Sequence, residues 1–214
     1  MPVGAPFFVG RSIPASSGMT IHKGNGMQAV FPAAVLAAAC ADAKAYLRDG
    51  SALNDARIEP LAQAALALAE AFTGLALIAR EHVETVPVGG AWVPLTAGPV
   101  GAITQVDGLP AEGAAFALSV GAFAIDIDAR GVGWVRVLQP GIAGRVRVTF
   151  AAGMASEWAE LPAPVRQGVV LLITHLADER SADSAPPAAV TALWRPWRRM
   201  RLAGAAAFRA AAGG

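Results

Sequence analysis

The side chains that could do chemistry are few and scattered along the chain. The three histidines, His22, His82 and His175, lie in separate segments and form no His-x-x-x-His or His-Glu-x-x-His pattern, so no two of them are spaced as metal ligands on one helix. The chain also has no Gly-x-Ser-x-Gly elbow, no phosphate-binding P-loop, no Cys-x-x-Cys pair and no cluster of carboxylates. We therefore expect no enzyme, no bound metal and no cofactor.

Two short stretches imitate known motifs without their context. The segment "DIDARG" (126–131) opens like a calcium-binding loop but lacks the remaining ligands of the twelve-residue set. The segment "GNGMQA" (24–29) resembles part of a dinucleotide-binding loop, yet no strand precedes it and no βαβ unit surrounds it. We interpret the first as a strand end followed by a turn, and the second as coincidence.

The strongest recognition signal is the segment "TALWRPWRRMRL" (191–202). No acidic residue follows Asp183, so this end of the chain is locally cationic. Arginine suits bidentate contacts with carboxylates, and tryptophan is enriched among binding hot spots because it buries a large rigid area. We predict a partner-binding set here, made of Trp194, Arg195, Trp197, Arg198, Arg199 and Arg201. Such a segment could dock into a groove of another protein or lie on phosphates; alternatively, the two tryptophans cap the chain's own core while the arginines stay solvated.

Composition excludes several other classes. The 17 basic and 16 acidic side chains give a net charge of +1, which argues against a protein that coats DNA. No apolar run reaches the roughly 18 to 20 residues of a membrane span. The single cysteine, Cys40, rules out an intrachain disulfide and favours assembly in the cytoplasm. The apolar run at 27–43 has the length of a signal peptide, but the preceding Arg11 and Lys23 are not clustered and a helix continues through the supposed cleavage site.

Hydrophobic periodicity predicts helices on both sides of a β-rich segment. A 3.6-residue period indicates helices over 32–48, 55–73 and 161–180, with a short helix at 190–197. Pro60 fits poorly inside the second helix, which should either begin near Glu59 or kink there. Gly74 is a natural stop for that helix. The expected apolar stripes are Leu36, Cys40, Ala43 and Leu47 in the first helix, Ile58, Leu61, Ala65, Leu68 and Phe72 in the second, and Val165, Val169, Leu172, Ile173 and Leu176 in the third.

Between these helices the hydrophobic period changes to two. Seven short strands are predicted at 77–86, 91–95, 100–108, 114–120, 122–128, 133–138 and 145–153, separated by Gly and Pro turns. The expected fold class is α+β, a helical bundle with an inserted antiparallel β-sandwich or barrel-like domain and an extended C-terminal tail. The expected division is an N-terminal arm (1–29), a helical hairpin (30–75), the inserted β domain (76–153), a bundle helix (154–182) and a C-terminal docking segment (183–214).

Five motifs in this order resemble one known family. They are "AKAYLRDG" with "NDARIEPLAQAALALAEAFTG", then "LTAGPVGAITQVDG", "VRVTFAAG", "LPAPVRQGVVLLITHLADER" and "PPAAVTALWRPWRRMRL", which together span residues 33–202. This layout resembles the head–tail connector, or adaptor, proteins of long-tailed bacteriophages, prophages and gene transfer agents. Two positions depart from the family pattern: Trp197 stands where the aromatic is often tyrosine, and Ala177 replaces a common aromatic.

The resemblance implies a structural role in the neck of a particle assembled in the bacterial cytoplasm. Such proteins form a ring, typically of twelve copies, under the portal protein, with their C-terminal segment inserted into the portal and a stopper or tail protein below. Double-stranded DNA passes through the ring, and no membrane is involved. The resemblance makes the six tryptophans and arginines listed above the portal-binding set. We expect that segment to order only on docking, so that deletion of residues 191–214 leaves a folded monomer unable to attach.

Two other functions remain open from the sequence. One is a stopper or tail-completion protein of the same neck, which would bind the adaptor ring rather than the portal. The other is a nucleic-acid-binding module that uses the arginine-rich end, for which DNA affinity would fall steeply with salt because neutralised phosphates release counterions.

Overall fold

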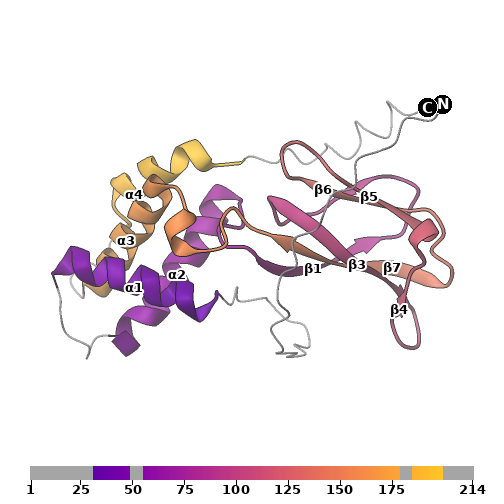
Figure 1. The fold of residues 1–214 in the computed structure, drawn as a ribbon, viewed down its shortest axis with the longest axis horizontal. Coiled ribbons are helices and arrows are strands. Elements are labelled where there is room, and N and C mark those ends of the chain that lie inside the picture. Colours follow the sequence, from indigo (N-terminus) through magenta and orange to yellow (C-terminus); the bar gives the residue numbers. More distant parts are fainter. Residues whose placement is uncertain (1–30, 49–54, 179–184, 200–214) are drawn as a thin grey trace, which may run out of the picture.

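The computed structural model describes residues 31–48, 55–178 and 185–199, which form a helical part and a β part side by side along the long axis of the molecule (Figure 1). The N-terminal arm and the residues after 199 lie outside the described ranges. The predicted α+β fold class is confirmed, since the described residues form four α-helices and two antiparallel sheets. How the chain divides into domains stays a prediction.

Four helices form the helical part: α1 (Ala33–Leu47), α2 (Asp55–Thr73), α3 (Ala163–Ala177) and α4 (Ala188–Trp194). The third packs against both of the first two, and α4 packs on α3. Their shared core takes most of its apolar area from leucine, valine and tryptophan side chains and its close packing from alanines such as Ala39, Ala62 and Ala65, which are fully buried. Because alanine has only a methyl group, the helix backbones can approach closely at these positions.

The buried stripes of α1 and α2 differ in part from the predicted ones. Leu47 and Leu68 were expected in the core, but they are 44% and 49% exposed, whereas Leu66 is fully buried. The buried apolar residues of α2 are Ile58, Ala62, Ala65, Leu66 and Ala69. Alanine can lie on the buried or the exposed face of a helix. An alanine-rich sequence therefore predicts that a helix forms more reliably than it predicts which face of that helix is buried.

Pro60 lies inside α2, which begins at Asp55 rather than near Glu59. It occupies the sixth position of the helix, where its missing N–H leaves the carbonyl of Ala56 without the usual hydrogen bond. Ala56, Glu59 and Pro60 are all exposed, so water can reach the backbone there. Of the two alternatives that the sequence left open, a late start is therefore wrong.

The β part contains all seven predicted strands. They are β1 (Arg80–Pro87), β2 (Val93–Pro94), β3 (Val100–Pro110), β4 (Phe116–Ala117), β5 (Phe123–Ile127), β6 (Gly133–Val137) and β7 (Ala143–Ala152). One sheet has the order β1-β7-β3-β4 and the other the order β2-β6-β5. Their apolar faces share one core, in which Val146, Val148 and Phe150 of β7 meet Val135 and Val137 of β6. This is the arrangement of a β-sandwich.

A short junction joins the two parts. The Arg80 guanidinium on β1 forms a two-pronged ion pair with the Glu70 carboxylate on α2, at 2.6 and 2.8 Å. The same carboxylate accepts a hydrogen bond from the Leu77 backbone N–H at 2.8 Å. Close to it, the Ala79 N–H donates to the carbonyl of Ala155 at 2.7 Å. Both groups of the Arg80–Glu70 pair are largely buried, with 16% and 12% exposed side chains, so the pair holds the end of α2 in a fixed position against β1.

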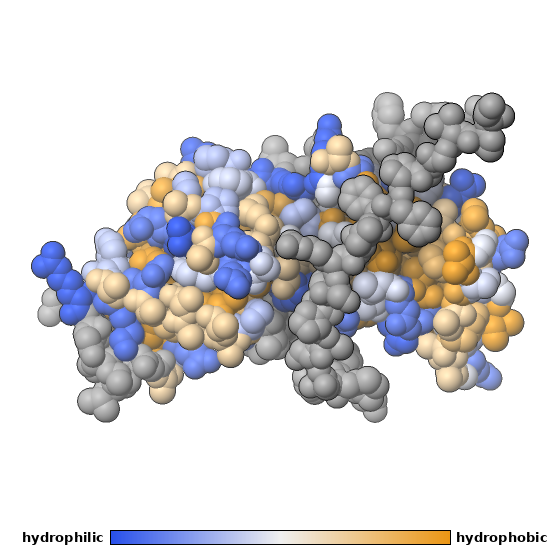
Figure 2. Space-filling view, in the orientation of Figure 1, coloured by the Kyte–Doolittle hydropathy of each residue, from blue (hydrophilic) through white to orange (hydrophobic). Residues whose placement is uncertain are grey.

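Apolar and polar side chains are interspersed over the helical part, and apolar ones gather more densely at the far end of the β part (Figure 2). Among the described residues, no helix combines the length and the hydropathy needed to cross a membrane.

Candidate interaction surface

The C-terminal residues 188–199, called the strap below, fold back onto the helical part. The strap consists of α4, the 3-10 turn η4 (Arg195–Trp197) and two further residues. Its last backbone N–H, from Arg199, donates to the carbonyl of Thr73 at the end of α2, at 2.7 Å. Pro187 precedes the first turn of α4, a position where its fixed φ suits the start of a helix. The strap is therefore an ordered part of the fold up to Arg199.

Trp194 anchors the strap in the core. Its side chain is 3% exposed, and its indole Nε1 donates to the carbonyl of Val165 on α3 at 3.2 Å. The indole lies over Gly168, where an added Cβ would come within 2.2 Å of Nε1. The glycine thus makes room for the ring, and the hydrogen bond satisfies the one polar atom that burial removes from water.

Phe72 connects the buried and the exposed sides of the strap. Its ring centroid lies 5.9 Å from that of Trp194 at an interplanar angle of 51°, a tilted aromatic pair. The guanidinium carbon of Arg198 lies 5.6 Å from the centroid of the same ring. This distance is within the range of a cation–π contact, so one of the predicted partner-binding arginines is already in contact with its own chain.

Arg199 ties the strap to both parts of the molecule. Beyond its backbone bond to Thr73, its Nη1 donates to the carbonyl of Arg130, in the turn between β5 and β6, at 2.8 Å. At this point the strap passes close to Gly74, which ends α2 as predicted and has a φ of 69°. An added Cβ at Gly74 would lie 3.0 Å from the carbonyl oxygen of Arg199, so glycine serves both the helix end and the close approach.

The structure separates the six predicted partner-binding residues into different environments. Trp194 is buried, Trp197 is partly buried against the helical core, and Arg195, Arg198 and Arg199 are exposed. Arg201 lies outside the described residues. The burial of Trp194 does not fit a role in direct contact with a partner. It fits the alternative, in which a tryptophan caps the chain's own core. The expected loose segment likewise does not include residues 188–199, which are packed.

The exposed part of the strap is a cationic rim made of Arg195, Arg198 and Arg199 beside the partly buried ring of Trp197. Arginines on such a rim can form bidentate bonds with carboxylates or phosphates of a partner. No carboxylate of a described residue forms an ion pair with these three side chains. Within the described ranges, no group of three or more potential metal ligands is present. The rim is thus suited to recognition of a partner.

His82 lies in the core of the β part, and its environment is structural. The ring is 8% exposed and stacks on Phe150 with centroids 5.7 Å apart, and its Nε2 has no hydrogen-bond partner. Burial, followed by the nearby Arg80 cation, lowers its pKa from the usual 6.5. The unfolded chain then binds the proton more readily than the folded one, so this histidine reduces stability as the pH falls below about 6.5.

The sequence missed the residues that receive the strap. Phe72 was predicted as part of a helix stripe, but neither its contact with Trp194 nor the role of Thr73 and Gly168 was foreseen. Gly168 carried the only usable signal, because a glycine within an otherwise apolar helical pattern often marks a close approach. The identity of the approaching group depends on a segment 26 residues later in the chain, which no local pattern reveals.

The comparisons with known proteins point to one kind of particle. One similar structure is the neck of an empty gene transfer agent particle computed with C6 symmetry: it is 27% identical, with a TM-score of 0.66, and the match covers 82% of this chain and 97% of that chain. The neck of a native particle computed with C12 symmetry matches at 27% identity and a TM-score of 0.63, over 85% of this chain and all (100%) of that one. A chain from the virion of a native gene transfer agent matches at 26% identity and a TM-score of 0.59, over 77% and 91%.

No protein-family model matches the chain, and no curated protein matches it. The structural matches nevertheless span the helical part and the β part together, at identities above the level at which only the fold is informative. The resemblance to connector proteins predicted from the ordered motifs is thus confirmed at the level of the particle neck, and the chain is similar, in sequence and fold, to chains of gene transfer agent necks and of a gene transfer agent virion.

Proposed function

We propose that this chain is the adaptor of the neck of a phage-like particle, a ring-forming structural protein that joins the portal of a DNA-filled head to the stopper or tail. The observation that carries the proposal is the likeness to gene transfer agent necks over 82% of this chain and 97% of the matched chain. Because that match includes nearly the whole neighbour, it supports a structural neck protein of a phage-like particle rather than a shared module in an unrelated protein.

Symmetry supports a ring. The neck structures that match were computed with C12 and C6 symmetry, and a closed ring needs two different surfaces on each copy that fit one another. An elongated chain with an α-helical end and a β end can present distinct faces to its neighbours, to the portal and to the stopper (Figure 1). In this proposal the ring, of twelve copies as is typical of the family that the chain resembles, assembles in the cytoplasm without a membrane and leaves a central channel for DNA.

For the portal contact we propose the exposed rim of the strap, together with residues that follow Arg199, including Arg201. Arg195, Arg198 and the edge of Trp197 are accessible, so they can meet carboxylates or carbonyls of a portal without refolding of the chain. Trp194 has a different role in this proposal: because it is buried, it holds the strap on the helical part and so fixes the orientation of the exposed arginines. Preorganisation of this kind reduces the entropy lost on binding.

The test mixes the purified full chain with the portal protein of the same particle and images the product by electron microscopy. We expect rings of this chain attached to the portal. The variant Arg195→Glu/Arg198→Glu should weaken attachment by at least about tenfold, because two of the three exposed cations of the rim are reversed. The matched control is Arg48→Glu/Arg145→Glu, which reverses two arginines that are exposed far from the strap and should bind as the unchanged chain does.

Deletion of residues 191–214 is not a clean test, because it would remove Trp194 from the core. A variant that ends at Arg199 keeps the strap, so its attachment to the portal measures only the contribution of the later residues. Rings that attach equally well after reversal of Arg195 and Arg198 would overturn the proposed contact. Binding to a preformed adaptor ring but not to the portal would instead indicate a stopper, and DNA binding with a steep salt dependence would indicate a nucleic-acid-binding module.

A further inference from the structure

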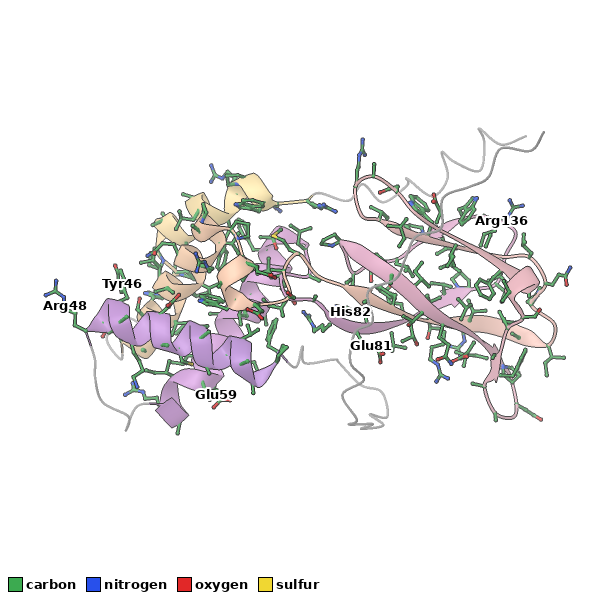
Figure 3. The ribbon with its side chains drawn as sticks, viewed as in Figure 1. Tyr46, Arg48, Glu59, Glu81, His82 and Arg136 are labelled. Atoms are coloured by element: carbon green, nitrogen blue, oxygen red, sulfur yellow. The ribbon has the colours of Figure 1, made fainter. Side chains whose placement is uncertain are left out.

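A groove at the far end of the β part has no occupant among the described residues. It lies between the loop that joins β1 to β2 and the end of β6, and its volume is about 300 Å³. Gly89 and Gly90 form one wall, and Arg136 and Leu138 form the other. Figure 3 labels Arg136 in this region, well away from the helical part. The groove is therefore separate from the strap and its cationic rim.

Arg136 is an incompletely satisfied cation. Its Nε is buried and has no hydrogen-bond partner, and the side chain forms no ion pair with a described carboxylate. A charged donor that has lost its water without gaining an acceptor is costly, and native proteins rarely leave one without a reason. A carboxylate placed in the groove would supply that acceptor and form a charge-assisted hydrogen bond.

The walls of the groove limit what can enter it. An added Cβ at Gly89 or Gly90 would meet nothing within 4 Å, so the space beside the loop is open. Neither glycine has a positive φ, so their lack of a side chain is not needed for the turn. Val88 and Pro140 add apolar groups to a lining that is otherwise partly polar. A short segment with small side chains and one carboxylate would fit these walls.

An exposed apolar patch borders the groove. It consists of Val120, Leu138 and Ile142, which are 88%, 48% and 76% exposed. The Leu138 N–H donates to the carbonyl of Ala122 at 2.8 Å, which holds the turn that carries Val120 next to the groove. Figure 2 shows apolar side chains gathered at this end of the molecule. Exposed apolar patches beside a polar recess are typical of protein contacts.

A complementary feature projects from another side of the same β part. The turn between β3 and β4 has the sequence Ala-Glu-Gly-Ala-Ala at 111–115, and all five residues are exposed. Its one charged side chain is Glu112, flanked by small residues only. Gly113, at a φ of 98°, permits the tight turn. In the view of Figures 1 and 3, this hairpin projects on the opposite side from Arg136, so the two features of one chain do not meet.

We propose that the β3–β4 hairpin of one copy docks into the Arg136 groove of the next copy, with the Glu112 carboxylate bound to the Arg136 guanidinium. The contact joins two different surfaces, which is what a closed ring requires. It rests on the proposed function for its place in a neck ring, but the contact itself is a property of this chain alone. Charge complementarity selects a second copy as the occupant: Arg136, whose Nε has no acceptor, lines the groove, and Glu112 is the one carboxylate on the exposed turn.

Cross-linking tests the contact without disturbing the two charges. Two versions of the full chain are made, one with Ala111→Cys in the hairpin and one with Gly90→Cys in the groove wall, and both are treated with a short bis-maleimide. Heterologous contact predicts a covalent dimer when the two are mixed and little when either is alone. The unchanged chain is the control for Cys40, which is buried. Irreversible capture makes the experiment sensitive to weak association.

Charge exchange then identifies the pair. In the mixed sample, Arg136→Glu in the groove version or Glu112→Arg in the hairpin version should each lower the cross-link yield by roughly tenfold, and the two together should restore it. Arg48→Glu, which reverses an exposed arginine at the end of α1 in the helical part, is the matched control and should change nothing. Gly89→Leu should also block the contact by filling the groove, whereas Gly101→Leu, at the opposite end of β3 where φ is not positive and an added Cβ would make only an ordinary 3.9 Å contact, should not.

The results separate this contact from the neck role. Attachment to the portal without a cross-link in the mixture would overturn the hairpin contact and leave the proposed function intact. A cross-link that depends on both charges, in a chain that never binds a portal, would support the contact and remove its place in a neck. Equal cross-linking of all samples, or yields unaffected by either charge reversal, would overturn the contact.

Discussion

The strap and the groove both present arginine side chains to a potential partner. They differ in how many contacts these arginines already make with groups of their own chain. In the strap, Arg198 lies over the Phe72 ring and Arg199 donates to the carbonyl of Arg130. In the groove, the buried Nε of Arg136 has no acceptor. The strap lies in the part of the sequence richest in arginine, whereas Arg136 stands alone in a strand. The density of arginine thus indicates a charged surface, and only the local hydrogen bonding indicates which arginine lacks a partner.

The difference predicts that substitutions in the two regions differ in their effect on stability. Changes in the strap remove contacts that the folded chain makes, so they should reduce the free energy of unfolding. A change at the groove removes a desolvated charge without a partner, so it should affect binding far more than stability.

The largest effect is expected for Trp194→Ala. This change leaves a cavity against Gly168 and removes a buried hydrogen bond, and we expect a loss of about 3–5 kcal/mol in the free energy of unfolding. Chemical denaturation followed by circular dichroism measures it. Trp197→Ala is the matched control and should cost clearly less, since Trp197 is only partly buried. Equal costs for the two would mean that the strap is not part of the core.

A smaller effect is expected for Arg198→Ala. The variant loses the cation–π contact with Phe72, which at an exposed position is worth about 0.5–1 kcal/mol. The same denaturation experiment measures the change, and Arg195→Ala, an exposed neighbour for which no such ring contact is seen, serves as the reference. If both variants were as stable as the unchanged chain, the contact with Phe72 would carry no energy and the whole rim would be free for a partner.

The smallest effect on stability is expected for Arg136→Met. Methionine replaces the apolar stem of the side chain but removes the guanidinium group with its unsatisfied Nε, so the change should lie within about 0.5 kcal/mol of zero. The same variant should lose the cross-link between hairpin and groove. A large loss of stability would show that Arg136 is held by its own chain, and would remove the contrast between the two regions.

Patterns of sequence predicted the secondary structure well, for reasons that particular elements make plain. In β7, Val146, Val148 and Phe150 alternate with polar residues, and this pattern needs one buried face whichever strands lie beside it. In α3, a proline at the start and a broad apolar face fix both the beginning of the helix and its buried side. Where alanine dominates, as in α1 and α2, the pattern fixed the helices but misplaced Leu47 and Leu68.

By itself, the sequence determined the order of helices and strands, the absence of familiar catalytic motifs and, through its ordered motifs, the resemblance to neck proteins. These depend on local periodicity and on residues close together in the chain. Tertiary structure decided that Trp194 points inward and that Arg136 lacks an acceptor. Both outcomes depend on groups far away in sequence, such as Gly168 for Trp194, because burial and desolvation are set by what packs around a side chain rather than by its neighbours along the chain.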